Sequence, residues 1–95
     1  GGDVNDTGEW LAAVASAIER QWIRPDSVSP GVVCPIRIRI LPGGEVMSAE
    51  VQPSCPYDAK ARDSVERAVM KASPLPYSGY NVPGRDIVVR FQASR

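Results

Sequence analysis

The side chains that could support chemistry in this chain are few, and no histidine accompanies them. Ser48, Ser64 and Ser73 carry hydroxyl groups, but a serine becomes a nucleophile only beside a base that takes its proton. Histidine is the commonest such base and the commonest metal ligand. Asp58 and Asp63 fall in a segment that we predict to be helical and solvent-facing. We therefore expect a protein that is not an enzyme and that binds no metal or cofactor.

The two cysteines, Cys34 and Cys55, bracket a predicted β-hairpin. Apolar and polar residues alternate over 34–40 and again over 47–52. The sequence Leu-Pro-Gly-Gly separates these two runs and is typical of a tight turn. The hairpin therefore places one thiol near each end of its open side.

The register of this hairpin decides how close the thiols come. A two-residue Gly-Gly loop places Ile40 opposite Met47 and Cys34 opposite Pro53, with Cys55 one diagonal step away. A wider turn or a bulge near Pro53 places the two cysteines directly opposite each other. Both registers favour a disulfide, which closes a loop of about 20 residues and contributes about 3 kcal/mol. Two free buried thiols in a reducing compartment are the alternative.

Two helices are predicted from apolar spacing and from their ends. The first begins after an Asp6 cap and ends near residue 23 or 24, because Pro25 pushes the preceding residue out of helical geometry. Its apolar face comprises Leu11, Val14, Ala15, Ile18 and Trp22, with Trp10 at the margin. The second helix ends before Pro74, and its apolar stripe comprises Ala61, Val65, Ala68, Val69 and Ala72.

A third strand over 86–91 completes the order helix, strand, strand, helix, strand. We expect one α+β domain over residues 1–95, with residues 1–6 as a disordered or cloning-derived start. The first strand fills the space between the other two and runs antiparallel to both, which gives the order 2-1-3 in a three-stranded antiparallel sheet. Both helices then cover the face of the sheet that carries the isoleucines.

Charge argues against two classes of partner. The chain has 11 Lys and Arg against 11 Asp and Glu, so bulk attraction to nucleic acid or to anionic lipid is not expected. No apolar run is long enough for a membrane span. Arg37, Arg39, Arg90 and Glu50 share the outer face of the sheet, either as a polyanion site or as a solvated surface partly neutralised by Glu50.

The third strand lies at an edge of the predicted sheet and contains no proline or lysine to block its free backbone groups. Such an edge favours capture of a partner's extended peptide as an added strand. The alternative is an edge masked by a partner copy or by the 75–84 connection. We predict a binding edge formed by Asp86, Ile87, Val88, Val89, Arg90 and Phe91, with Tyr77 and Tyr80 as flanking contacts.

Three segments in this order, "AIERQWIRP", "CPIRIRILPGGEV" and "SVERAVMKASPLP", resemble the C-terminal periplasmic domain family of TolA and TonB. The second helix lacks the tryptophan that TonB domains usually carry before the closing proline, so the sequence is more similar to TolA. It also lacks the glycine at which many relatives turn into that helix. The resemblance implies a periplasmic location, which is consistent with an oxidised Cys34–Cys55 pair.

The same resemblance implies partners. They are TolB and Pal at the outer membrane, and TolQ and TolR through a missing upstream part anchored in the inner membrane. Filamentous phage minor coat protein and group A colicins are further partners of the family. The alternatives are a TonB-type domain that docks outer-membrane transporters and a small disulfide-bonded secreted inhibitor of cystatin type. The sequence lacks the Gln-Val-x-Val-Gly loop of such inhibitors.

Overall fold

The structure is a computed structural model and describes residues 7–93. The elements follow in the predicted order: α1 (Gly8–Gln21), β1 (Cys34–Ile40), β2 (Val46–Val51), α2 (Ala59–Lys71) and β3 (Asp86–Phe91). The predicted start at residues 1–6 and the Asp6 cap lie outside the described residues.

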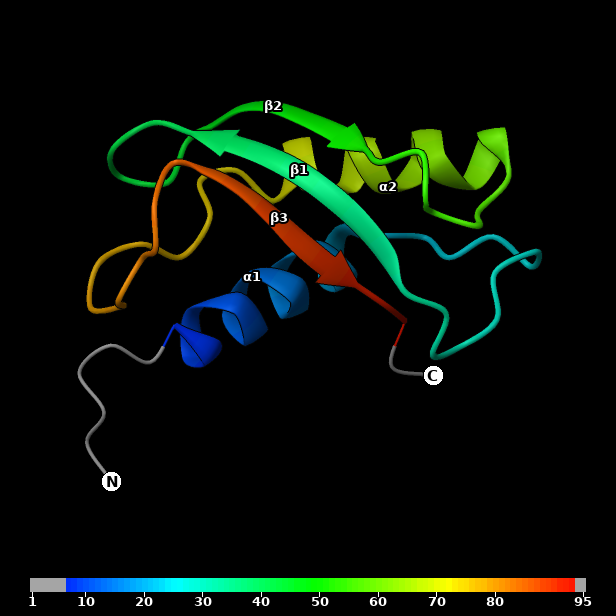
Figure 1. The fold of residues 1–95 in the computed structure, drawn as a ribbon, viewed down its shortest axis with the longest axis horizontal. Helices are drawn as coiled ribbons and strands as arrows, with labels where there is room; N and C mark the ends of the chain where they lie inside the picture. Colours follow the sequence, from blue (N-terminus) through cyan, green and yellow to red (C-terminus); the bar gives the residue numbers. More distant parts are fainter. Residues whose placement is uncertain (1–6, 94–95) are drawn as a thin grey trace.

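The sheet has the predicted order β2-β1-β3, and β1 pairs antiparallel with both neighbours. Figure 1 shows the two helices on one side of the sheet, with α2 along β2 and α1 beneath β3. The α+β class, the strand order and the placement of the helices are therefore confirmed. The other face of the sheet carries no helix in the described chain.

The core lies between the isoleucines of β1 and the two helices. Trp10 is fully buried, and its indole Nε1 donates a hydrogen bond to the carbonyl of Pro76 at 2.6 Å. The prediction that placed Trp10 at the margin is wrong. The chain after α2 folds back over the first turn of α1, and this return covers a side chain that helical spacing alone leaves at the edge of the stripe.

Helix α1 ends at Gln21, earlier than predicted, and Trp22 has an extended backbone with φ −99° and ψ 128°. From there Trp22 donates a hydrogen bond from Nε1 to Ser64 Oγ at 2.6 Å. Its ring stacks on Tyr57 and meets Phe91 edge-to-face, at centroid distances of 6.1 and 5.1 Å. These tertiary contacts, rather than Pro25, decide where the helix ends.

The hairpin follows the predicted register only away from its turn. Ile38 lies opposite Ala49, but Ile40 lies opposite Val46 rather than Met47, with a bulge between the two pairs. The amide of Leu41 donates to the carbonyl of Glu45, so the loop has three residues instead of two. The bulge turns Met47 away from the core, and its side chain is 59% exposed.

The turn also touches the chain that follows α2. Gly44 has a φ of +99°, and a Cβ atom there would collide with the carbonyl oxygen of Leu75. The amide of Leu75 donates to the carbonyl of Gly44 at 2.8 Å, so both backbones meet at this point. Glycine is therefore required at residue 44 both for its backbone conformation and for this close approach.

Cys34 and Cys55 form the expected disulfide, and both are buried. Beyond Cys55 the guanidinium of Arg62 donates to the carbonyls of Cys55 and Tyr57, which fixes the turn into α2. Helix α2 then starts at an Asp58 cap, whose carboxylate accepts from the Ala61 amide at 2.8 Å. Asp58 is thus the N-cap of α2, whereas it was predicted only to be a solvent-facing residue of this helix.

Candidate functional site

The two edges of the sheet differ in how their free backbone groups are used. At the β2 edge the amide of Val51 donates to Glu66 Oε2 at 2.9 Å, and the amide of Val46 donates to Ser73 Oγ at 3.0 Å. Glu66 belongs to α2, and Ser73 follows its last turn. Glu66 and Arg62, one helical turn apart, form no ion pair with each other among the described residues, because each side chain binds backbone groups instead. Side chains therefore block the β2 edge.

The β3 edge has no such cover in the described part of the chain. The amide of Ile40 donates to the carbonyl of Arg85, so Ile40 and Arg85 are a hydrogen-bonded pair of the β1–β3 ladder. Paired positions alternate along an antiparallel strand, so residues 87, 89 and 91 bond to β1 while residues 86, 88 and 90 direct their N–H and C=O groups outward. No described loop donates or accepts a backbone hydrogen bond at these three outward positions.

Beside this edge lies a groove of about 300 Å³ between β3 and α1. Leu11, Ala12 and Ala15 of α1 line one side of it. Val88, Val89 and Arg90 of β3 line the other side. An additional strand hydrogen-bonded to β3 would therefore lie over the flank of α1, with its inward side chains directed at Leu11 and the two alanines. The small alanines leave room there for side chains of a partner.

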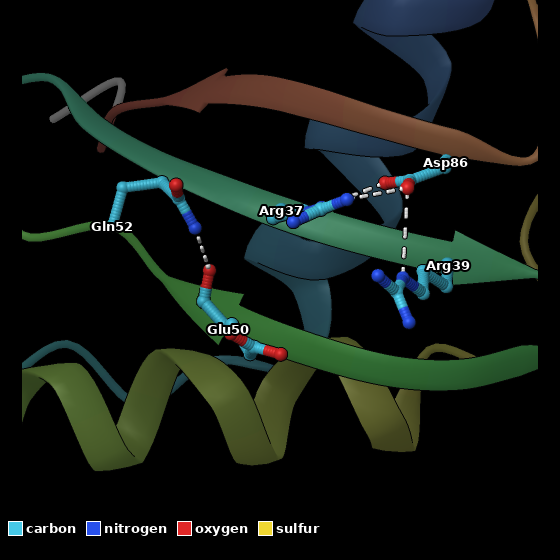
Figure 2. Close-up of polar contacts among 5 residues, drawn as sticks. All are labelled: Arg37, Arg39, Glu50, Gln52 and Asp86. Carbon is cyan, nitrogen blue, oxygen red and sulfur yellow. Dashed lines mark hydrogen bonds and ion pairs between the residues drawn. The ribbon is translucent and has the colours of Figure 1, made fainter.

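Asp86, at the start of β3, joins this strand to β1. Its carboxylate accepts two hydrogen bonds from Arg37, at 2.8 and 2.6 Å, and lies 3.5 Å from Arg39 Nε (Figure 2). Glu50 lies opposite Arg37 in the sheet, yet no ion pair joins it to either arginine among the described residues. Asp86, on the neighbouring strand, is therefore the main partner of the arginines, and the charge of Glu50 adds a weaker attraction to Arg37.

The same contacts lower the pKa of Asp86 below its ordinary value of 3.8, chiefly through the hydrogen bonds from Arg37. A carboxylate with a lowered folded-state pKa adds stability above its unfolded pKa and loses it as the pH falls through the folded pKa. We expect Asp86→Asn to lower the melting temperature at about pH 7, and we expect its difference from the wild type to shrink as the pH falls below the ordinary pKa of 3.8. Thermal unfolding followed by circular dichroism across this range measures both.

Glu50→Gln is the matched control for this prediction, since it removes a carboxylate from the same face without breaking an ion pair of the described residues. It should change the melting temperature less than Asp86→Asn at neutral pH. A constant difference between Asp86→Asn and the wild type at every pH would contradict the role given to the Asp86 charge.

The 75–84 connection packs away from the β3 edge at its first residues, where Leu75 bonds to Gly44 and Pro76 accepts from Trp10. Tyr77 is partly buried against the core, and Tyr80 is 39% exposed. The amide of Tyr80 donates to the carbonyl of Tyr77 in a turn. Their role as flanking contacts remains a prediction.

Two of the serines considered as nucleophiles have structural roles in residues 7–93. Ser64 accepts a hydrogen bond from Trp22, and Ser73 accepts one from the backbone of Val46, so both hydroxyls have structural partners. No group of three described His, Cys, Asp or Glu side chains could hold a metal ion. Neither of the described helices combines the length and apolar character needed to cross a bilayer.

Comparison with known proteins adds a family to this geometry. The family model described as "TonB C terminal" matches residues 7–91, which is nearly the whole chain. The chain belongs to the TonB C-terminal family. The expected membership of a TolA/TonB C-terminal-like family is therefore confirmed.

The fold of this TonB C-terminal domain is also similar to a solved structure of TolAIII bound to a peptide derived from the N-terminus of TolB. The TM-score is 0.73 at 24% sequence identity, and the match covers 100% of this chain and 79% of the TolAIII chain. This likeness shows a shared fold. No protein in the curated collection matches the sequence.

Proposed function

We propose that this domain is a binding module that takes up an extended segment of a partner protein as a fourth strand at the β3 edge. The asymmetry of the sheet edges carries the proposal. Side chains of Glu66 and Ser73 occupy the β2 edge, whereas the outward groups of residues 86, 88 and 90 have no such partners within the described chain. A free edge with outward N–H and C=O groups is the template for strand addition.

We further propose a TolA-like role in the periplasm, with the N-terminal segment of TolB as the partner. The similar fold of TolAIII, solved with such a peptide, supports this choice. Pal, TolQ and TolR, filamentous phage coat protein and group A colicins follow from the family resemblance alone. A TonB-type role at outer-membrane transporters is the second candidate, supported by the family description. In either role the domain acts by binding rather than by catalysis.

Val88→Pro tests the edge directly. The Val88 amide points outward, so proline there spares the β1–β3 ladder, and its ring occupies the space of an incoming strand. We expect a TolB N-terminal peptide to shift the amide resonances of residues 86–91 in the wild type. In Val88→Pro we expect its affinity to fall by about tenfold or more, since one donor is lost and the approach is blocked.

Val88→Thr is the matched control, because it keeps both the amide donor and the β-branched shape. This variant should bind the peptide like the wild type. Equal affinities of Val88→Pro and Val88→Thr would overturn the proposal, as would shifts confined to the 25–31 loop, which would place the peptide on another surface.

A further inference from the structure

The two sides of the β3 edge differ chemically, and this difference restricts which segment can bind there. The inference rests on the proposed strand addition. Side chains of an added strand alternate between the helix side of the sheet and its open side. The surroundings on each side therefore specify alternate residues of the partner.

The helix side of the edge is apolar. Leu11 and Ala15 are partly buried, Ala12 is exposed, and Val89 of β3 is 2% exposed at the floor of the groove. The α1 side chains that line the groove are uncharged, and Arg90, the one charged lining residue, directs its side chain to the opposite face because side chains alternate along β3. A charged side chain placed there would lose water without gaining a partner, whereas an apolar side chain of moderate size would bury its surface.

The open side carries an unused positive charge. Asp86 is already engaged by Arg37 and Arg39. Arg90, farther along the same strand and exposed, forms no ion pair with another described residue. On the adjacent strand β1 it lies opposite Pro35, whose side chain carries no charge. On the open side, Arg90 near the end of β3 is therefore available to pair with an acidic partner residue. Asp86 at the start of β3 is already paired with Arg37 and Arg39.

We propose that the segment accepted by β3 is an acidic amphipathic strand. It carries apolar residues of moderate size at alternate positions, directed at Leu11, Ala12 and Ala15. On its opposite face an aspartate or glutamate lies beside Arg90. Backbone bonds to residues 86, 88 and 90 hold the strand, and the two sets of side chains select it.

Capped synthetic peptides of equal length test this selection by NMR titration. The first alternates valine with serine and carries one glutamate on the serine face. The second replaces that glutamate by lysine, and the third scrambles the first so that the alternation is lost. We expect the glutamate peptide to bind the wild type about threefold to tenfold more tightly than the lysine peptide, with the scrambled peptide weakest.

Two variants separate the contribution of the Arg90 charge to binding from the contribution of the apolar groove beside α1. Arg90→Glu should invert the order of the glutamate and lysine peptides. Ala12→Leu should fill the groove and weaken both peptides. Ala17→Leu is its control, since Ala17 borders a different hollow beside the end of α2 and should leave both affinities unchanged.

The outcomes distinguish this inference from the proposed function. Equal binding of all three peptides with shifts at residues 86–91 would overturn the selection and leave strand addition intact. Binding of the TolB peptide at β3 without binding of any designed peptide would do the same. Failure of every peptide at β3 would overturn both.

Discussion

Replacing Trp10 by alanine lowers the free energy of unfolding by about 3–5 kcal/mol, the range found for large aromatic side chains removed from a core. Trp10 is 0% exposed and sits between α1 and the chain around Pro76, so no surface rearrangement fills the space it leaves. Domains of this size are stable by only about 5–15 kcal/mol. Urea unfolding followed by the fluorescence of Trp22 and by circular dichroism measures the loss.

Two further variants divide this effect into its parts. Trp10→Phe keeps most of the apolar volume but leaves the Pro76 carbonyl without its donor, so it should cost about 1–3 kcal/mol. Ile23→Ala removes a large apolar side chain that is 87% exposed, and it should change stability by less than about 0.5 kcal/mol. A Trp10→Ala variant as stable as Ile23→Ala would show that the indole does not anchor the core.

The second large effect is expected from the disulfide. Replacing Cys34 and Cys55 together by alanine should lower the free energy of unfolding by about 3 kcal/mol, because their separation of 21 residues leaves a long loop unconstrained in the unfolded chain. Each kcal/mol corresponds to about 4–8 °C in a domain of this length. The melting temperature should therefore fall by roughly 12–24 °C.

The wild type in a strong reductant is the natural comparison for the double variant. Both should unfold at similar temperatures, since both lack the covalent constraint while differing little in side-chain volume. The double variant should still bind a strand at β3, because Cys34 lies on β1 opposite Phe91 and its replacement leaves the outward backbone groups of residues 86, 88 and 90 unchanged. A melting temperature unchanged by the double replacement would contradict the stabilising role.

Much of the fold was predictable because it depends on local patterns. Alternation over β1 and β3 and the 3- and 4-residue spacing in α2 identify these elements directly, and chain order with antiparallel pairing gives the arrangement β2-β1-β3. The disulfide followed from the hairpin, since every register considered brought the sulfurs together. These features need only neighbours in sequence or one pair of strands.

The misplaced details share a different cause. The burial of Trp10, the end of α1 at Gln21 and the pairing of Ile40 with Val46 each depend on a contact between segments far apart in sequence, or on a bulge. Periodicity averages over a segment and cannot detect one return of the chain or one extra residue in a turn. The partner of Arg37 was missed for the same reason, because Asp86 lies 49 residues away.

Some features of the candidate site were also predictable from local patterns, and others were not. The sequence by itself determined that the third strand contains no proline or lysine, and that its Ile87, Val89 and Phe91 face inward. Only the tertiary structure decided that Glu66 and Ser73 block the opposite edge and that α1 places small residues beside β3. Alternation along one strand is a local property of the backbone, whereas an edge is open or closed according to side chains that distant elements bring to it.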